Sequence, residues 1–394
     1  MNFWDSAKAI EPELIATRRQ LHRHPEIAFE EHWTSAFIAD QLEKLGLEVR
    51  RNVGRTGVLA VLRGAQAGPT IALRADIDAL PVTEESGVDF ASEIPGRMHA
   101  CGHDTHITSL LGAARLLTEA RAEIKGNVVF LFQPAEELGA GAEAMLADGA
   151  FADPKPDMVF GLHNHPEVPI GKVAIKSGPL MAASAVFEIR VTGKGGHGAL
   201  PHRNIDPIVA ASAIVMSLQT IASRNVSPLE PVVVTVGQFE AGTAFNIIPA
   251  TATLRGTFRA FDAGLYSDLP KMIDRIAGET AAAYGATVET AYECSIAAPV
   301  VNDEQATAII EGAVAKALGQ AAVVRPTPSM GGEDFSIFQK QVPGCFVWLG
   351  VGNPEIGAIH PWHSPHYKVD ESALKIGAYT LAQAAVDAMA QLSR

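Results

Sequence analysis

Short, uninterrupted runs of hydrophobic residues occur at both ends of the chain, and each run stops abruptly at polar residues. Such runs are typical of strands that are buried on both faces, as in a parallel sheet covered by helices. They lie within 70–81, 127–137, 157–165 and 344–352. Between and before them, helices are predicted over 5–23 and 105–121, with Pro25 just past the end of the first. The pattern predicts an α/β fold with a mostly parallel sheet covered by helices.

The middle of the chain follows a different pattern. Strands are predicted for 185–196, 231–242, 250–261 and 287–293, and helices for 206–223 and 269–286. The order strand-helix-strand-strand-helix-strand is that of a ferredoxin-like α+β domain. We therefore predict a discontinuous first domain, 1–181 with 295–394, and an inserted second domain, 182–294.

Composition excludes several classes of function without naming one. The 394 residues are 47% hydrophobic and 19% charged, and 44 acidic against 31 basic residues give a formal net charge of −13. Because no Lys/Arg-rich block is present, we expect no nucleic-acid or anionic-membrane partner. There is no run of about 18 apolar residues, no leader-like N-terminus and, with three cysteines, no disulfide framework. We expect a cytoplasmic protein without a membrane span.

Polar side chains follow the predicted buried strands where the strands end. Asp76 and Asp78 follow one run, Glu136 and Glu137 follow the next, and His163 ends a third. In an open α/β sheet, functional residues collect beyond the carboxyl ends of the strands. We expect these five side chains to share one site.

The stretch MHACGHDTH, residues 98–106, is the densest group of candidate residues. Cys101 and His103 have C-x-H spacing, and a thiolate with an imidazole on one turn suits zinc or another borderline divalent ion. The alternative is a buried cysteine beside Asp104, which would cap the helix that follows. Both interpretations are open from these residues alone.

Glu136 and Glu137 also have two interpretations. Adjacent acidic residues usually belong to a solvated loop, but these follow an apolar run, VVFLF. A hydrolytic metal site needs one carboxylate as a ligand and a second, uncoordinated one as general base. An adjacent pair can supply both.

Histidines elsewhere in the chain add candidate ligands without fixing which of them bind. His163 and His165 follow a predicted strand, and His360, His363 and His366 cluster near the C-terminus. Each can be a ligand or an ordinary turn residue, although such clustering favours metal. Nucleophile chemistry fits less well, because there is no G-x-S-x-G motif and a cysteine-hydrolase interpretation leaves the paired carboxylates without a role. The sequence has no CxxC pair or dinucleotide-binding fingerprint.

The inserted domain contributes His197, within the glycine-rich stretch 193–202, together with Asn246 and Arg259. Glycines let a backbone approach a ligand closely. Imidazole, amide and guanidinium together can bind a carboxylate and an oxyanion. A flexible hairpin is the alternative interpretation.

Ten motifs follow one another along nearly the whole chain: RRQLHRHPE, RADIDALP, MHACGHDTH, FQPAEE, GLHNH, GKGGHGALPH, FNIIP, GTFR, MGGEDFSIF and HSPHYKVDE. In this order they resemble the hippurate hydrolase and auxin-conjugate hydrolase branch of the dinuclear metallo-aminoacylases and carboxypeptidases. The resemblance implies a dimetal catalytic domain with an inserted lid and dimerisation domain. It implies hydrolysis of N-acyl amino acids to a carboxylic acid and a free amino acid. Dipeptidase or carboxypeptidase activity on the same scaffold is one alternative. A second is a non-catalytic binding protein on a decayed enzyme fold, which would be expected to lack part of the ligand set.

The resemblance also implies roles for residues at matching motif positions. The implied metal ligands are Cys101, His103, Glu137, His163 and His363. Cys101 would bridge two ions, and Glu136 would act as general base and proton shuttle. The wider family has a histidine ligand where this chain has Asp76, and His103 is the implied substitute.

Further implied roles lie outside the ligand set. Asp78 would orient a ligand, and His197 would help to hold the oxyanion, often across a dimer. Implied substrate contacts and pocket-lining residues are Asn246, Arg259, Gly331 and Gly332.

The implied cofactor is a pair of divalent ions per subunit. Nitrogen, oxygen and sulfur ligands make zinc the first expectation, with manganese, cobalt and nickel as alternatives. The implied partners are a small N-acyl amino acid substrate and further copies of the chain, assembled as a dimer or tetramer through the lid.

Overall fold

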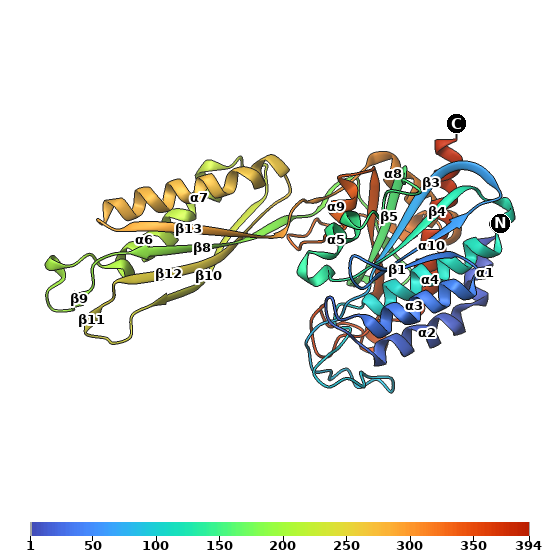
Figure 1. Cartoon of the computed structure of the whole chain (residues 1–394), viewed down its shortest axis with the longest axis horizontal. Coiled ribbons are helices and arrows are strands. Elements are labelled where there is room, and N and C mark those ends of the chain that lie inside the picture. The colour runs from blue at the N-terminus through green and yellow to red at the C-terminus, as the bar shows by residue number, and fades with distance from the viewer. Residues whose placement is uncertain (1, 394) are drawn as a thin grey trace. The chain divides into compact units, whose positions relative to one another are not determined.

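Two structural units alternate along the chain in the computed structural model, which describes residues 2–393 (Figure 1). Apart from the two terminal residues, unit 1 comprises Met1–Gly178, Val301–Thr327 and Asp334–Arg394, and unit 2 comprises Pro179–Val300 and Pro328–Glu333. The return of the chain to unit 2 at 328–333 leaves no sign in the hydrophobic pattern. The division into two functional domains, one of residues 1–181 with 295–394 and the other of residues 182–294, stays a prediction.

One eight-stranded sheet forms the centre of unit 1. Its strands, in order across the sheet, are β1 (Glu48–Val53), β2 (Gly57–Arg63), β4 (Lys125–Gln133), β3 (Gln66–Asp76), β5 (Met158–Pro169), β16 (Gly344–Gly352), β6 (Val173–Ala174) and β15 (Val323–Val324). β3 pairs in parallel with β4 and β5, and β16 pairs in parallel with β5. β1, β2 and β4 are joined antiparallel. The mostly parallel sheet is confirmed for the central strands β4, β3, β5 and β16, and antiparallel pairs lie on both sides of them, since β16 pairs antiparallel with β6.

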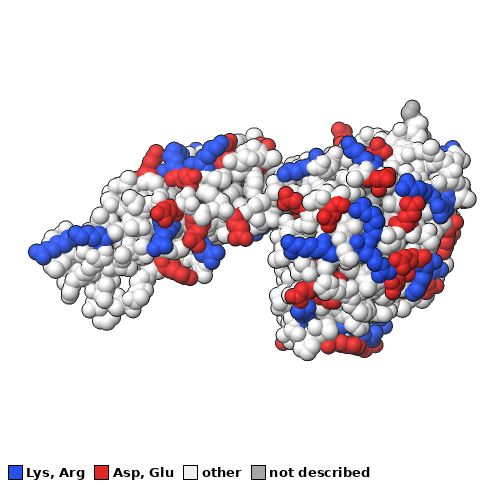
Figure 2. Space-filling model, in the orientation of Figure 1, with Lys and Arg blue, Asp and Glu red and all other residues white. Residues whose placement is uncertain are grey.

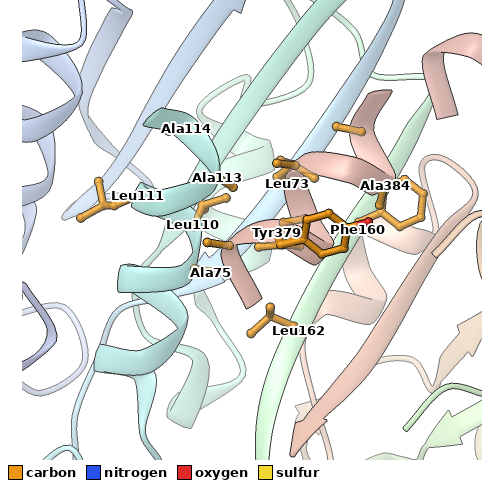
Figure 3. Packing of buried hydrophobic residues seen from close by; sticks show 14 of the residues in the cluster. Leu73, Ala75, Leu110, Leu111, Ala113, Ala114, Phe160, Leu162, Tyr379 and Ala384 are labelled. Carbon is orange, nitrogen blue, oxygen red and sulfur yellow. The ribbon is translucent and has the colours of Figure 1, made fainter. Parts of the chain in front are cut away.

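Helices pack against this sheet. They are α1 (Phe3–Ala9), α2 (Glu11–Arg23), α3 (His32–Lys44), α4 (His103–Glu119), α5 (Gly141–Ala147), α8 (Glu304–Leu318), α9 (Phe335–Gln339) and α10 (Ala373–Leu392), with single 3-10 turns at η1 (Arg121–Glu123), η2 (Glu136–Leu138), η5 (Gln320–Ala322) and η6 (Pro354–Ile356). Figure 3 shows the core where Leu73 of β3, Leu110 of α4, Phe160 of β5 and Tyr379 of α10 lie together. Every position of β16 is buried, as expected for a central parallel strand.

The prediction of one helix over 5–23 was wrong, because the chain forms α1 and α2 with a break at Ile10. Pro12 lies in the first turn of α2. Proline has no N–H to donate to the preceding turn, but it fits the start of a new helix. The apolar spacing continues across the break, so periodicity alone does not reveal it.

Unit 2 has the predicted strand and helix order. Its elements are β8 (Ala183–Thr192), α6 (Pro207–Leu218), β10 (Val232–Ala241), β12 (Thr251–Ala260), α7 (Ala263–Ala283) and β13 (Thr287–Ile296), with η3 (Pro201–Arg203), a π turn η4 (Ile221–Asn225), and a short ladder of β9 (Gly196–His197) with β11 (Ile247–Ile248). The sheet order is β10-β12-β8-β13 and all pairs are antiparallel. Two short strands, β7 (Gly178–Met181) and β14 (Val300–Asn302), lie where the chain passes between units.

The predicted start of the last helix of unit 2 was wrong. α7 begins at Ala263 rather than 269, because Asp262 accepts a hydrogen bond from the Leu265 N–H and caps the helix there. Pro270 therefore lies inside the helix rather than in its first turn.

The first helix of unit 2, α6, has apolar residues on its exposed side as well as on its buried side. By length and composition alone, the described segment Pro207–Asn225 is apolar enough to cross a membrane, but 33% of it is buried inside the fold. Ala210, Ile214 and Leu218 belong to the core of unit 2, whereas Met216 is exposed. Packing within unit 2 therefore explains the apolar character of its buried side only.

Charged side chains of both signs are interspersed on the face shown in Figure 2. This view shows no stripe of Lys and Arg of the kind that tracks a phosphate backbone. The picture agrees with the absence of a basic block in the sequence.

Replacement of Phe160 tests the core of unit 1. Phe160 is 0% exposed, and Phe160→Ala should lower the free energy of unfolding by about 3–5 kcal/mol, since it leaves a cavity. All four tryptophans (Trp4, Trp33, Trp348 and Trp362) lie in unit 1, so tryptophan fluorescence during urea unfolding reports on this unit. The exposed-site variant Ile356→Ala should change stability by about 0.5 kcal/mol or less. Equal losses in the two variants would contradict the assigned core.

Candidate metal centre

The predicted strand-end residues lie at one edge of the unit 1 sheet. Asp76 ends β3 and Asp78 follows it, Glu136 and Glu137 form η2 after β4, and His163 lies in β5. Because β4, β3 and β5 are adjacent and parallel, their carboxyl ends meet at the same edge.

Cys101 and His103 reach the same edge from the N-terminus of α4. Gly102 stands at the N-cap position with a left-handed φ of 80°, a conformation that glycine adopts without strain. The turn brings one ligand-type atom each of Cys101, His103 and Glu137 within 4.8 Å of one another.

Two further candidate ligands border this group. His163 Nε2 lies 3.4 Å from Cys101 Sγ, and His363 Nε2 lies 3.6 Å from Glu137 Oε1. Glu136 Oε2 lies 4.0 Å from His103 Nε2. All five candidate ligands and the candidate base therefore gather at one place in unit 1.

Two atoms at the centre of this group are buried without a hydrogen-bond partner among residues 2–393. They are His103 Nε2 and Glu137 Oε1, which lie 3.8 Å apart. Leaving such atoms unpaired costs about 1–3 kcal/mol each. A sulfur, an imidazole nitrogen and a carboxylate oxygen facing one another form the donor set that zinc-like ions bind, so these residues fit a divalent cation.

Hydrogen bonds behind the two buried histidines direct their Nε2 atoms inward. Asp78 Oδ1 lies 3.2 Å from His103 Nδ1, and Asp78 Oδ2 accepts the Glu137 backbone N–H at 3.0 Å. His163 Nδ1 lies 2.7 Å from the Asn164 carbonyl oxygen. A partner on the outer nitrogen fixes the ring and the tautomer that a metal ligand needs.

Without a cation the site retains protons. Burial, Glu137 and Glu136 raise the pKa of the Cys101 thiol well above its usual value. Burial and Asp78 raise the pKa of Glu137. Burial opposes charge on His103, but Asp76 and Asp78 outweigh it and raise the His103 pKa to about 10. A divalent ion would take the place of these protons, so binding should be pH-dependent.

The remaining candidate histidines do not join the donor group. His165 packs between the rings of Trp348 and Trp362 at 4.6 and 4.5 Å, and burial lowers its pKa to about 4. The His360 ring lies 5.4 Å from that of His366, whose Nδ1 is 2.8 Å from the Glu85 carbonyl oxygen.

His363 differs from these neighbours in its backbone. Its φ of 64° is left-handed, which is uncommon outside glycine. Its N–H donates to the Ala100 carbonyl at 2.9 Å, which ties the C-terminal loop to the loop of Cys101.

The predicted capping role of Asp104 was wrong. The helix begins at His103, so Asp104 lies within its first turn. It is fully buried and accepts hydrogen bonds from Arg18 Nε and His22 Nδ1, each at 2.8 Å. His22 Nε2 lies 3.0 Å from Glu84 Oε1, so both ring nitrogens of His22 face carboxylates.

The sequence-based reasoning did not identify Arg18 and His22, although both are in RRQLHRHPE. They lie four residues apart on the face of α2 that also buries Leu14 and Leu21. A polar pair on a buried helical stripe is a signal that could have found them.

His106 and His99 are structural in different ways. His106 Nδ1 bonds Asp76 Oδ1, and its Nε2 accepts the Asn164 N–H at 2.8 Å. Both nitrogens of His99 are buried without a hydrogen-bond partner in the described part of the chain, and burial lowers the His99 pKa to about 3.

The candidate residues of unit 2 form two separate groups. His197 pairs with Ile247 across the β9–β11 ladder, and the Gly198 N–H donates to the Asn246 carbonyl at 2.9 Å. At the other end of the sheet, Arg259 Nη1 donates to the Met330 carbonyl at 2.7 Å.

Gly331 and Gly332 belong to the Arg259 group. A Cβ on Gly332 would come within 2.6 Å of the Ile296 side chain, so a side chain would not fit there without movement. Since β12 runs between the two groups with a rise of about 3.4 Å per residue, they lie roughly 30 Å apart within unit 2.

A largely parallel sheet with sulfur, imidazole and carboxylate donors at its carboxyl edge defines a metallopeptidase-like hydrolase. The chain belongs to peptidase family M20/M25/M40, whose model matches residues 72–387. This confirms both the α/β fold class and the family resemblance.

Relatives and a solved structure cover nearly the whole chain. N-acetyl-L-cysteine deacetylase of Bacillus subtilis is 42% identical over 95% of this chain and 88% of its own. IAA-amino acid hydrolase ILR1-like 4 of Arabidopsis thaliana is 41% identical over 93% of this chain and 83% of its own. The YXEP protein of Bacillus subtilis, described as a dinuclear metal binding peptidase, superposes with a TM-score of 0.86 at 39% identity over 97% of this chain and 99% of its own. The hippurate and auxin-conjugate hydrolase branch is therefore the correct one.

The contacts of His22 generate a pH prediction. Burial opposes its charge, but Asp104 and Glu84 outweigh burial and raise the His22 pKa in the folded chain. A raised pKa means that the stabilisation is fully present below the unfolded-state pKa of about 6.5 and is lost as pH rises through the folded-state value. His22→Gln should therefore lower the free energy of unfolding by about 3–5 kcal/mol at about pH 6, and by less at about pH 9.

Tryptophan-monitored urea unfolding of wild type and variant at both pH values measures this difference. The exposed-site variant His32→Gln serves as control and should show no such pH-dependent loss. An equal or larger loss for His22→Gln at the higher pH would contradict the buried ion pair.

Proposed function

We propose that this chain is a metal-dependent amidohydrolase that cleaves the amide bond of N-acyl amino acids, releasing a carboxylic acid and a free amino acid. The observation that carries this proposal is the group of Cys101, His103 and Glu137, in which His103 Nε2 and Glu137 Oε1 are buried without a hydrogen-bond partner among the described residues. The relatives support it, since one is named a deacetylase of an N-acylated amino acid and another a hydrolase of amino acid conjugates.

The proposed ligands are Cys101, His103, Glu137, His163 and His363. Two divalent ions, when bound, would polarise the substrate carbonyl and lower the pKa of the attacking water. Cys101 is the proposed bridging ligand, because both His163 and the His103–Glu137 pair border its sulfur. Zinc is the proposed ion on account of the mixed S, N and O set, with manganese, cobalt and nickel as alternatives.

Glu136 is the proposed general base. It neighbours the ligand Glu137 in the same 3-10 turn and is 8% exposed. Its carboxylate would accept a proton from the attacking water and then deliver it to the leaving amine nitrogen. Asp78 would hold His103 in position through the Nδ1 contact.

Residues of unit 2 would bind the substrate. His197 Nδ1 accepts the Ala199 N–H at 3.1 Å, so a neutral His197 carries its proton on Nε2 and can donate it to an oxyanion. Asn246, Arg259, Gly331 and Gly332 are the other proposed contacts. Because His197 and Asn246 lie far from Arg259 within unit 2, we propose that they serve different subunits of a homodimer or larger oligomer formed through the lid.

The proposed location is the cytoplasm.

Replacement of the general base tests the assignment of Glu136. Glu136→Gln should retain bound metal, since Glu137 and not Glu136 is the proposed ligand, and should lower kcat by a factor on the order of 10² or more. Hydrolysis of N-benzoylglycine and metal content are measured on the same preparation. Glu143→Gln, an exposed-site control in the same unit, should retain wild-type activity. Wild-type turnover in Glu136→Gln would remove Glu136 from this role.

Metal removal with a substrate panel tests the reaction itself. Activity on N-acetyl- and N-benzoyl-amino acids should be lost when a chelator removes the metal and should return with zinc, manganese or cobalt. Dipeptides with a free amine should be poorer substrates. Full activity in metal-free protein would contradict the proposal, and a preference for free dipeptides would favour the peptidase alternative.

A further inference from the structure

Asn164 stands between His163 and His165 in GLHNH and is fully buried. A side-chain amide is not among the sulfur, imidazole and carboxylate donors of the proposed centre, and a buried asparagine is commonly a local turn residue that bonds its own backbone. The contacts of Asn164 are different, because nearly all of them reach segments distant in the sequence.

The side-chain amide of Asn164 holds the turn that carries Cys101. Its Nδ2 donates to the Cys101 carbonyl at 2.8 Å and to the Gly102 carbonyl at 3.2 Å. A Cβ on Gly102 would lie 2.5 Å from this same Nδ2. The left-handed glycine and the asparagine thus fit each other, and neither tolerates a larger neighbour.

The side-chain oxygen of Asn164 holds the C-terminal loop. Its Oδ1 accepts hydrogen bonds from the Tyr367 hydroxyl and, at 3.2 Å, from Trp362 Nε1. Trp362 directly precedes His363 in the sequence, and Tyr367 is buried four residues after it.

The backbone of Asn164 completes the set. Its carbonyl lies 2.7 Å from His163 Nδ1, and its N–H donates to His106 Nε2 at 2.8 Å. One residue therefore contacts the three segments that supply four of the five proposed ligands.

We propose that Asn164 is a positioning residue that sets the spacing of Cys101, His163 and His363 for metal binding. The inference rests on the proposed function, because it assumes that these side chains are ligands. Its physical basis is that the side-chain amide of Asn164, with fixed donors and acceptors, ties the Cys101 turn and the C-terminal loop to β5, the strand that carries His163. Loss of such a partner should weaken metal binding even when the fold is retained.

The chain offers a matched control for this role. Asn302 is also buried in unit 1, and its Nδ2 donates to two carbonyls, those of Lys176 and Phe346, at 2.9 and 2.8 Å. It contacts none of the proposed ligand segments. Asn164→Ser and Asn302→Ser therefore both remove the hydrogen bonds of a buried side-chain amide without adding charge, one at the candidate site and one elsewhere.

The experiment titrates cobalt(II) into metal-free, folded protein and follows the thiolate-to-cobalt and d–d absorption bands, with circular dichroism as the measure of folding. Asn164→Ser should bind cobalt about 10- to 100-fold more weakly than wild type, with altered d–d bands. Asn302→Ser should bind within about twofold of wild type. If Asn164→Ser does not fold, Tyr367→Phe removes one hydrogen bond to Asn164 and should weaken binding several-fold.

The outcomes separate this inference from the proposed function. If wild type binds cobalt with a thiolate band and folded Asn164→Ser binds cobalt equally tightly, the role of Asn164 is overturned and the proposed function is not. If the serine variant does not fold, a Tyr367→Phe variant that binds cobalt as tightly as wild type would overturn the role of Asn164. A loss of cobalt affinity in Asn302→Ser equal to that in Asn164→Ser would overturn it too. Wild-type protein that binds no cobalt would overturn the proposed function and this inference together.

Discussion

The side chains of Cys101, His103 and His163 are buried at the carboxyl edge of the unit 1 sheet, and burying polar groups there costs free energy unless they find partners. A buried imidazole nitrogen or carboxylate oxygen without a partner is unfavourable, yet His103 Nε2 and Glu137 Oε1 have none in the described chain. Burial and the neighbouring carboxylates raise the pKa of Cys101, and carboxylates outweigh burial to raise the pKa of His103, so that protons are retained. A divalent cation would relieve the unpaired atoms and the excess of acidic groups at once.

Cross-links between distant segments hold these donors in place. Asp78 joins β3 to η2 and α4 through Glu137 and His103. Asn164 joins β5 to the start of α4 and to the C-terminal loop. Three of the candidate ligands, Cys101, Glu137 and His363, lie in short turns or loops, which would not keep a fixed spacing alone. The supporting residues are thus as informative about the site as the candidate ligands.

The sequence predicted the main features of the fold because they follow from local patterns. Continuous apolar runs predicted the central parallel strands, and the polar residues at their ends predicted that Asp78, Glu136 and Glu137 would lie together. Local pattern could not choose His363 over His360, since the choice depends on a left-handed backbone tied to Ala100. The cap assigned to Asp104 was wrong because Gly102 starts the helix earlier. Asn164 was missed because its significance lies only in long-range contacts.

A crystal structure of the protein with zinc, phased by zinc anomalous scattering, tests the proposed centre most directly. Two zinc peaks should appear on either side of Cys101, each about 2.3 Å from its sulfur. His103 and His163 should each bind zinc through Nε2. A single peak, or peaks that do not involve Cys101, would contradict the bridged dimetal site.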